Sequence, residues 1–213
     1  MGRTRGSKKS LNPSHDGFSA IVAAMTEMKV HTFLTPAAFE KWLARNHAKS
    51  SGIWIRYFNK ASGKKGITYA EALDVALCFG WIDSQAAAHD ADSHKQRFTP
   101  RGPRSMWSKR NQEHVARLIK EKKMTPAGLA QVQAAKKDGR WARAYDSSAN
   151  MKIPADFLKA LKKYKKASEF YKTLNRANLY AIAYRLQTAV KPETRERRMQ
   201  AILTQLEAQK KFH

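Results

Sequence analysis

The sequence predicts an α+β fold, with a small antiparallel sheet and helices in the N-terminal half and an all-helical C-terminal half. Short segments rich in β-branched and aromatic residues occur between residues 52 and 99, which is typical of strands. Helix caps and apolar residues at helical spacing recur from Ser108 onward. The 213 residues are 42% apolar, enough for a buried core. We therefore expect an α+β subdomain over 29–105 and a helical subdomain over 106–213.

Residues 1–28 are expected to form a flexible N-terminal extension. An apolar piece from Phe18 to Met25 follows several basic residues. It is short and no cleavage motif follows it, so we do not assign a signal peptide. Met25 and Met28 are alternative start candidates.

No membrane span is expected, and the protein is expected to be cytoplasmic. The longest strongly apolar run, from Val75 to Ile82, is far shorter than the roughly 18 residues that a spanning helix needs. The single cysteine excludes an internal disulfide framework and fits a reducing compartment.

The first helix and the first long strand follow local signals. Thr35 is a typical N-cap and proline is favoured at the next position, so a helix is predicted from Pro36 to about His47. The segment 52–58 is rich in β-forming residues and follows a polar stretch, which predicts a strand.

A second helix is predicted from Thr68 to Phe79. Thr68 and Glu71 have the spacing of a capping box, and Gly80 is a typical C-terminal stop. Apolar residues cover most of the circumference of this helix, so we expect it to be central to the core.

Two further strands are predicted at 81–88 and 94–99, joined by an acidic turn. Together with the strand at 52–58 they form the expected antiparallel sheet, and residues 30–34 are a candidate fourth strand. From Ser108 onward the chain is predicted to be helical. The predicted helices cover 108–121, 125–137, Pro154 to about Tyr164, Asn175 or Asn178 through Tyr184, and Pro192 through Leu206.

Positive charge is the dominant property of the composition. The formal net charge is +24, and residues 91–213 carry twenty-nine of the forty-one Lys and Arg but ten of the seventeen Asp and Glu. Such a field attracts nucleic acid, anionic lipid or acidic protein. Solubility alone would explain lysine-rich helix faces, but it does not require clustered arginines.

The segment 97–111 is the candidate binding site. Its arginines are interleaved with two prolines, which deny it a regular helix. Forked guanidinium groups on a stiff loop suit phosphate or carboxylate, and a neighbouring tryptophan could stack on a base or a sugar. The predicted ligand residues are Asp83, Arg97, Arg101, Arg104, Trp107, Lys109, Asn111 and Arg185.

A structural role for the same residues stays open. Arg97 and Arg101 could form ion pairs that join the two halves, and Trp107 could belong to the core. The candidate carboxylate partners of these two arginines are Asp74, Asp83 and Asp146. Arg185 could likewise be paired internally, with Asp138 or Asp146.

No catalytic residue, metal or cofactor is predicted. The seven histidines show no metal-ligand spacing, and the common nucleotide-binding and hydrolase motifs are missing. Cys78 has apolar neighbours and no activating base nearby in sequence, so we expect a buried thiol. Asp83 ends an apolar segment and must have a partner there, which leaves a catalytic carboxylate as an alternative.

Several short motifs occur in a fixed order along the chain. They are Ala72–Asp83, Arg97–Arg101, Trp107–Asn111, Met124–Gly128, Asp138–Trp141 and Asn175–Thr188. Through this ordered set, residues 30–208 resemble the YdeI/OmpD-associated family, whose members are also called bacteriocin-protection proteins. Ser84 departs from the family pattern, which usually has glycine there, and this change could alter the choice of ligand.

The resemblance implies a link to outer-membrane proteins and to survival of antimicrobial peptides or bacteriocins, and it implies no reaction. With the charge pattern, it leads us to expect a non-enzymatic protein that binds an anionic ligand and contributes to envelope-stress tolerance. The ligand could be a phosphate-containing molecule, a nucleic acid or an acidic protein surface. The alternatives are nonspecific nucleic-acid binding and an enzyme that acts on a phosphorylated or acidic small molecule.

Overall fold

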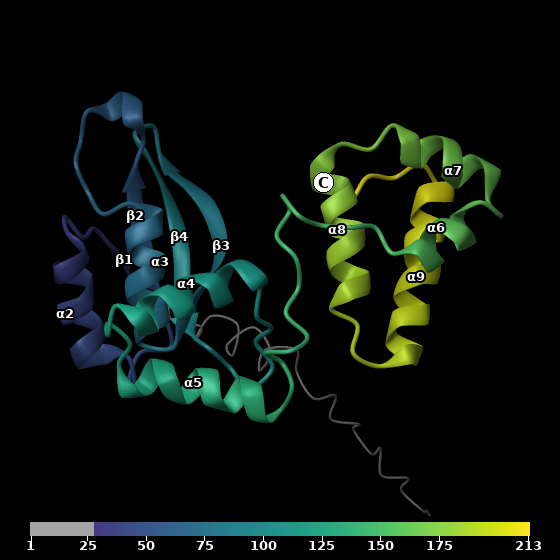
Figure 1. Cartoon of the computed structure of the whole chain (residues 1–213). Coiled ribbons are helices and arrows are strands. Elements are labelled where there is room, and N and C mark those ends of the chain that lie inside the picture. The colour runs from purple at the N-terminus through teal and green to yellow at the C-terminus, as the bar shows by residue number, and fades with distance from the viewer. Residues whose placement is uncertain (1–27) are drawn as a thin grey trace, which may run out of the picture.

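The computed structural model describes residues 28–213 (Figure 1). It confirms the α+β class, because a four-stranded sheet with helices is followed by helices only. The extension predicted over residues 1–28 lies outside the described residues except for Met28. No helix in the described part of the chain is long and apolar enough to cross a bilayer.

The sheet consists of β1 (Val30–His31), β2 (Ile53–Phe58), β3 (Trp81–Asp90) and β4 (Ser93–Pro100), in the order β1-β2-β4-β3. The pairs β2–β4 and β3–β4 are antiparallel, as predicted. The short β1 is parallel to β2, so the sheet is mixed rather than purely antiparallel. Helix α2 (Pro36–Asn46) connects these two strands, and a helical crossover is the usual connection between parallel neighbours.

Helices α2 and α3 (Tyr69–Cys78) begin at their predicted caps. Thr35 Oγ1 accepts a hydrogen bond from the backbone N–H of Ala38, and Thr68 and Glu71 make both bonds of the capping box. Gly80 has a φ of +74°, which a side chain would make strained, so α3 ends there and β3 begins directly. A 3-10 turn, η1 (Lys60–Ser62), follows β2.

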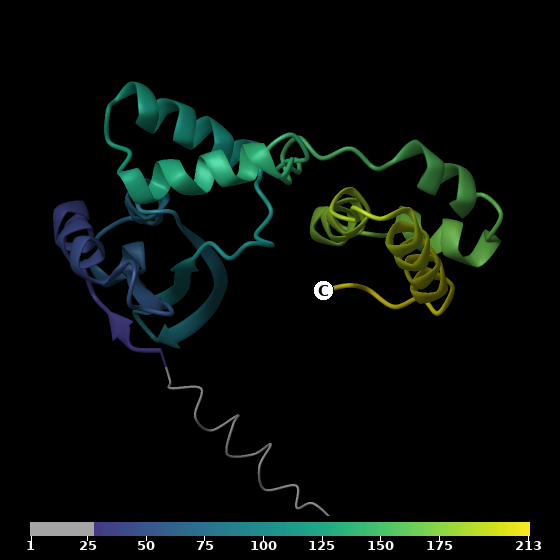
Figure 2. The same ribbon diagram turned by 90° about the horizontal axis from the view of Figure 1, so that it is seen from below.

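Helices α4 (Lys109–Lys120) and α5 (Pro126–Lys137) pack against α3, as Figure 2 shows for the two teal helices beside the sheet. The side chains of Ser108 and Thr125 cap them, as predicted. Gly128 lets α5 approach the end of α3, because a Cβ at this position would overlap the backbone carbonyl of Cys78.

The C-terminal helices are α6 (Ala155–Leu161), α7 (Lys165–Lys172), α8 (Arg176–Gln187) and α9 (Pro192–Glu207). The single helix predicted from Pro154 through Tyr164 is wrong, since the chain turns after Leu161 and α7 is a separate helix. Ser168 Oγ donates to the carbonyl of Leu161 at 2.9 Å and so satisfies a group that the helix end leaves free.

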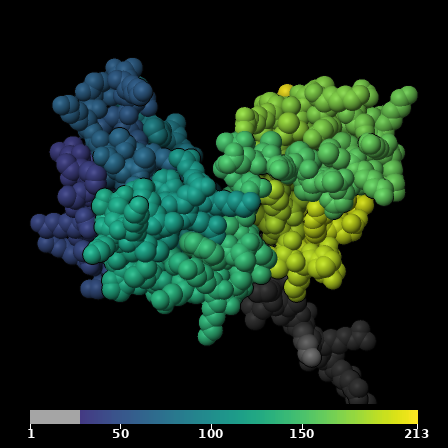
Figure 3. Space-filling model, viewed as in Figure 1, coloured from purple at the N-terminus to yellow at the C-terminus, as the bar shows by residue number. Residues whose placement is uncertain are grey.

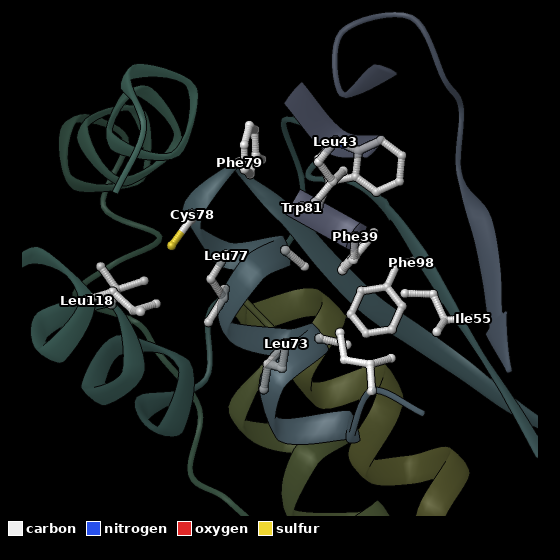
Figure 4. Packing of buried hydrophobic residues seen from close by; sticks show 14 of the residues in the cluster. Phe39, Leu43, Ile55, Leu73, Leu77, Cys78, Phe79, Trp81, Phe98 and Leu118 are labelled. Carbon is white, nitrogen blue, oxygen red and sulfur yellow. The ribbon is translucent and has the colours of Figure 1, made fainter. Parts of the chain in front are cut away.

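The buried apolar residues form two cores. The first lies between the sheet and helices α2 to α5, and its largest side chains, such as Phe39, Trp81 and Phe98, are at most 1% exposed (Figure 4). The second is formed by α6 to α9. The division of the apolar packing falls between Ala144 and Ile153, and Figure 3 shows the two groups as lobes in contact. The domain boundary predicted at residue 105 stays a prediction.

Candidate functional site

An open cleft of about 840 Å³ is lined by residues from the segments 103–106 and 138–143 and from the C-terminal part, 184–212. We call it the arginine cleft, because five arginines line it and Asp138 is its one lining carboxylate. The lining residues are Pro103, Arg104, Met106, Asp138, Arg140, Arg143, Tyr184, Arg185, Thr188, Val190, Arg198, Ala201, Ile202, Gln205 and Phe212. Five cations and one carboxylate leave four positive charges at this surface.

Arg140 and Asp138 form the fixed part of the cleft, in the turn after α5. Arg140 is 7% exposed, its Nε and Nη2 both lie 2.8 Å from Asp138 Oδ2, and its Nη1 donates to the carbonyl of Ser105 at 3.0 Å. The backbone N–H and the guanidinium of Arg140 lower the pKa of the Asp138 carboxyl. This carboxylate is therefore already committed to Arg140.

The remaining arginines of the cleft have no carboxylate within ion-pair distance among residues 28–213. Arg143 donates to the backbone carbonyl of Asp138, and Arg104 is exposed. Arg198 Nη1 donates to the carbonyl of Arg185 at 2.7 Å. These contacts orient the side chains without neutralising their charge.

Arg185 lies against the C-terminal tail. Its guanidinium carbon is 4.7 Å from the centroid of the Phe212 ring, a cation–π contact. Phe212 is held by Asn178, which is 0% exposed and accepts the backbone N–H of Phe212 at 2.6 Å. The tail thus forms an apolar wall of the cleft.

The structure separates the predicted ligand residues. Arg104 and Arg185 lie in the arginine cleft, whereas Arg101 and Trp107 are only 5% and 1% exposed. The Arg101 guanidinium lies 3.5 Å from the centroid of the Trp107 ring. A ligand could contact Arg101 or Trp107 only after a conformational change that exposed the side chain.

Arg101 is a buried cation without a carboxylate partner in the described residues. Its Nη1 donates to the carbonyl of Met106 at 3.1 Å, but its Nε and Nη2 have no hydrogen-bond partner there. Burial lowers the pKa of Arg101 to about 10. Because Met106 lines the arginine cleft, the hydrogen bond from Arg101 to its carbonyl helps to hold this part of the cleft in place.

The other predicted residues lie elsewhere. Arg97 is on β4 opposite Trp54, and Lys109 forms an ion pair with Asp146 at 2.7 Å. Asp83 and Asn111 share a smaller cavity. The ligand role of all these residues stays a prediction.

The internal ion pairs considered for Arg97, Arg101 and Arg185 are not formed among the described residues. Asp74 pairs with His114 and Arg117, and Asp146 pairs with Lys109. Asp83 Oδ2 accepts a hydrogen bond from the hydroxyl of Tyr69 at 2.8 Å. These carboxylates are therefore engaged with other groups.

Cys78 is buried, as predicted, and 7% exposed. Burial raises the pKa of its thiol to about 11, so little nucleophilic thiolate forms at neutral pH. Within residues 28–213, no group of three or more His, Cys, Asp or Glu side chains is arranged to hold a metal ion.

Sequence reasoning missed Arg140, Arg143 and Arg198, which complete the arginine cleft. Arg140 belongs to the motif Asp138–Trp141, which carried the family resemblance but was given no role. Arg198 lies on α9, among other basic residues with no local signal to distinguish it.

Two regions of the chain match family models. Residues 31–131 match a family described as Domain of unknown function (DUF8412). Residues 150–209 match the family described as Bacteriocin-protection, YdeI or OmpD-Associated. No match to the chain was found among curated proteins or among solved structures.

Proposed function

Because residues 150–209 match the family described as Bacteriocin-protection, YdeI or OmpD-Associated and a cleft rich in arginine lies beside them, we propose that the protein binds a polyanion in the arginine cleft. By this binding it contributes to tolerance of bacteriocins or antimicrobial peptides. The tolerance part of the proposal comes from the family description, and the binding part comes from the geometry of the cleft. We further propose that the protein acts in the cytoplasm, which its single buried cysteine supports.

The observation that carries the proposal is the uncompensated charge of Arg104, Arg143, Arg185 and Arg198 in one cleft. Guanidinium groups bind phosphate and carboxylate through paired N–H donors. The volume of about 840 Å³ lies within the range of roughly 300–1,000 Å³ that is usual for ligand sites. Apolar residues such as Met106 and Phe212 stand beside these charges and offer contacts to a nonpolar part of the ligand.

The two regions that match family models both contribute to the cleft. Arg104 belongs to the first matched region, and Arg185 and Arg198 belong to the second. Arg140 and Arg143 lie in the segment between them. Binding of a polyanion would therefore depend on both parts of the chain.

Calorimetric titration with inorganic triphosphate tests the proposal. The double variant Arg104→Ala/Arg143→Ala removes two charges from the cleft, and both side chains are exposed. Its matched control is Lys162→Ala/Lys163→Ala, which removes two exposed charges near the end of α6. We expect the cleft variant to lower the affinity about tenfold or more, and the control to change it less than about twofold.

Equal losses in the two double variants would contradict a specific site. That outcome, together with a steep fall in affinity with salt and little sequence preference, would favour nonspecific nucleic-acid binding driven by the net charge of +24. Failure of the parent protein to bind triphosphate at low salt would reject the cleft proposal. An enzyme acting on a phosphorylated or acidic molecule is favoured only if the bound ligand is converted.

The tolerance role has its own test. A host that lacks the gene should recover survival under bacteriocin or polycationic peptide when it expresses the parent protein or the lysine control. The cleft variant should fail to restore survival at the same protein level. Equal rescue by the two variants would separate tolerance from anion binding.

A further inference from the structure

A second cavity, of about 230 Å³, lies apart from the arginine cleft and shares none of its lining residues. Polar side chains from several elements converge on it. They include Tyr69 of α3, Asp83 of β3, Asn111 of α4 and Tyr180 of α8, and also Tyr145 and Ser147 from the segment between α5 and α6. We call this cavity the hydroxyl pocket.

Asn111 supplies a side-chain amide to this pocket. It is 8% exposed, and its backbone N–H donates to Ser108 Oγ as part of the α4 cap. Its side-chain amide has no hydrogen-bond partner among residues 28–213, although it lines the pocket. The amide atoms are not among the fully buried side-chain atoms of the described residues that lack a partner, so they are accessible from the pocket and can both donate to and accept from a ligand.

Asp83 supplies a free acceptor to the same space. Its Oδ2 accepts the hydroxyl of Tyr69 at 2.8 Å and lies 3.5 Å from Gln96 Nε2. Its Oδ1 has no partner in the described residues, and no Lys, Arg or His there forms an ion pair with Asp83. One carboxylate oxygen therefore remains able to accept hydrogen bonds from a ligand.

Tyr145 and Tyr180 add two hydroxyls with no hydrogen-bond partner in the part of the chain that the structure describes. Burial raises the pKa of Tyr145 to about 12, and burial also raises the pKa of Tyr180. Both hydroxyls therefore stay protonated at neutral pH and can donate as well as accept. Their rings provide flat apolar surfaces beside these polar groups.

The charge of the pocket argues against a polyanion. Asp83 and Arg110 are its two charged lining residues, so the pocket is close to neutral although the chain carries +24. The charge of Asp83 is also offset by the nearby Arg101: burial lowers the pKa of Arg101, and the Asp83 carboxylate acts against that shift. A small cation would gain little there, because Arg110 and Arg101 repel it.

Amide and hydroxyl groups that both donate and accept are complementary to hydroxyl groups, which do the same. We propose that the hydroxyl pocket binds a neutral polyhydroxyl molecule of about the size of one sugar ring. Asp83 accepts hydrogen bonds from its hydroxyls, Asn111 pairs with a further hydroxyl, and a tyrosine ring lies against its apolar face. A volume of about 230 Å³ is below that of a typical drug-sized site, so the pocket itself holds one small unit.

Saturation-transfer NMR with D-glucose, D-galactose and N-acetyl-D-glucosamine tests the proposal. At least one of these sugars should receive saturation from the parent protein. Asp83→Ala should lower its affinity about tenfold or more, because a hydrogen bond to a charged group is lost. Tyr180→Phe removes only a hydroxyl, preserves the fold, and should lower the affinity severalfold.

Asp92→Ala is the matched control, because it removes a carboxylate in the turn between β3 and β4 and should leave sugar binding unchanged. No transfer to any of the three sugars would overturn the proposal. An equal loss in the Asp92 and Asp83 variants would do the same. Triphosphate binding to the arginine cleft is measured separately, so either site can fail without the other.

Discussion

The two apolar cores differ in how far apart in the sequence their contacting residues lie. The first depends on contacts between distant residues, since β4 pairs with β2 and a buried helix covers the sheet. The second is formed by four short helices that follow one another along the chain. All five tryptophans lie between residues 42 and 141, and none lies in the second core.

This difference gives each core its own signal. Tryptophan fluorescence reports the first core, whereas far-UV circular dichroism reports the helices of both. Separate cores in one chain can unfold in separate steps, so a single free energy of unfolding need not describe the whole chain. Substitutions placed in one core should therefore act on one signal more than on the other.

The largest expected effect is that of Phe98→Ala in the first core. Phe98 is 0% exposed, and its ring centroid lies 6.0 Å from that of Phe39. Loss of this side chain should lower the free energy of unfolding of the first core by about 3–5 kcal/mol. In urea titrations the fluorescence midpoint should fall, while a part of the helical signal persists. Complete loss of both signals at one lowered midpoint would show that the cores unfold together.

Leu206→Ala is the counterpart in the second core. Leu206 is 0% exposed, and its truncation should cost about 2–5 kcal/mol. In urea titrations the part of the circular dichroism signal that comes from the C-terminal helices should be lost at a lower urea concentration. The fluorescence midpoint should stay unchanged. A fluorescence shift as large as the dichroism shift would contradict the independence of the cores.

A smaller effect separates two buried arginines. Arg101 has no carboxylate partner in the described residues, so Arg101→Met should cost less than about 1 kcal/mol or even stabilise the first core, because an unpaired buried charge is removed. Arg140→Met loses charge-assisted hydrogen bonds to Asp138 and should cost about 1–3 kcal/mol. The fluorescence midpoints of the two variants measure this order, and the reverse order would refute it.

The smallest effects are those of the helix caps, one in each core. Thr68→Ala breaks the capping box of α3, and Asn175→Ala removes the cap of α8. Each should cost about 1 kcal/mol. Thermal unfolding should show the first in fluorescence and the second only in circular dichroism. A fluorescence change in the Asn175 variant would indicate coupling between the cores.

Local signals made much of the fold predictable. The caps at Thr35, Thr68, Ser108 and Thr125 are contacts between residues three apart, so the sequence contains both partners. The end of α6 was missed because apolar spacing continues to Tyr164 past the turn. The parallel pairing of β1 was missed because it depends on a crossover rather than on neighbouring residues.

The sites were less predictable, because their residues are far apart in sequence. Arg104 and Arg198 meet in one cleft through the packing of two cores, and no pattern of spacing predicts that meeting. The prolines led us to predict a stiff loop that presents its arginines to a ligand. Arg101 is instead buried and stacks on Trp107. Whether a charged side chain is exposed thus depends on tertiary packing, which a short sequence motif does not predict.

Tyr145 connects the two lobes. Its backbone N–H donates to the carbonyl of Trp107 at 3.0 Å, its carbonyl accepts the N–H of Lys109 at 2.9 Å, and its ring lies 4.9 Å edge-on from that of Tyr184. A guest molecule beside Tyr145 would touch Asp83 on one lobe and Tyr180 on the other. A molecule that binds both lobes stabilises the contact between them. The melting temperatures of the two cores should therefore converge when such a molecule is added. This convergence would identify a ligand whose chemistry was not known beforehand.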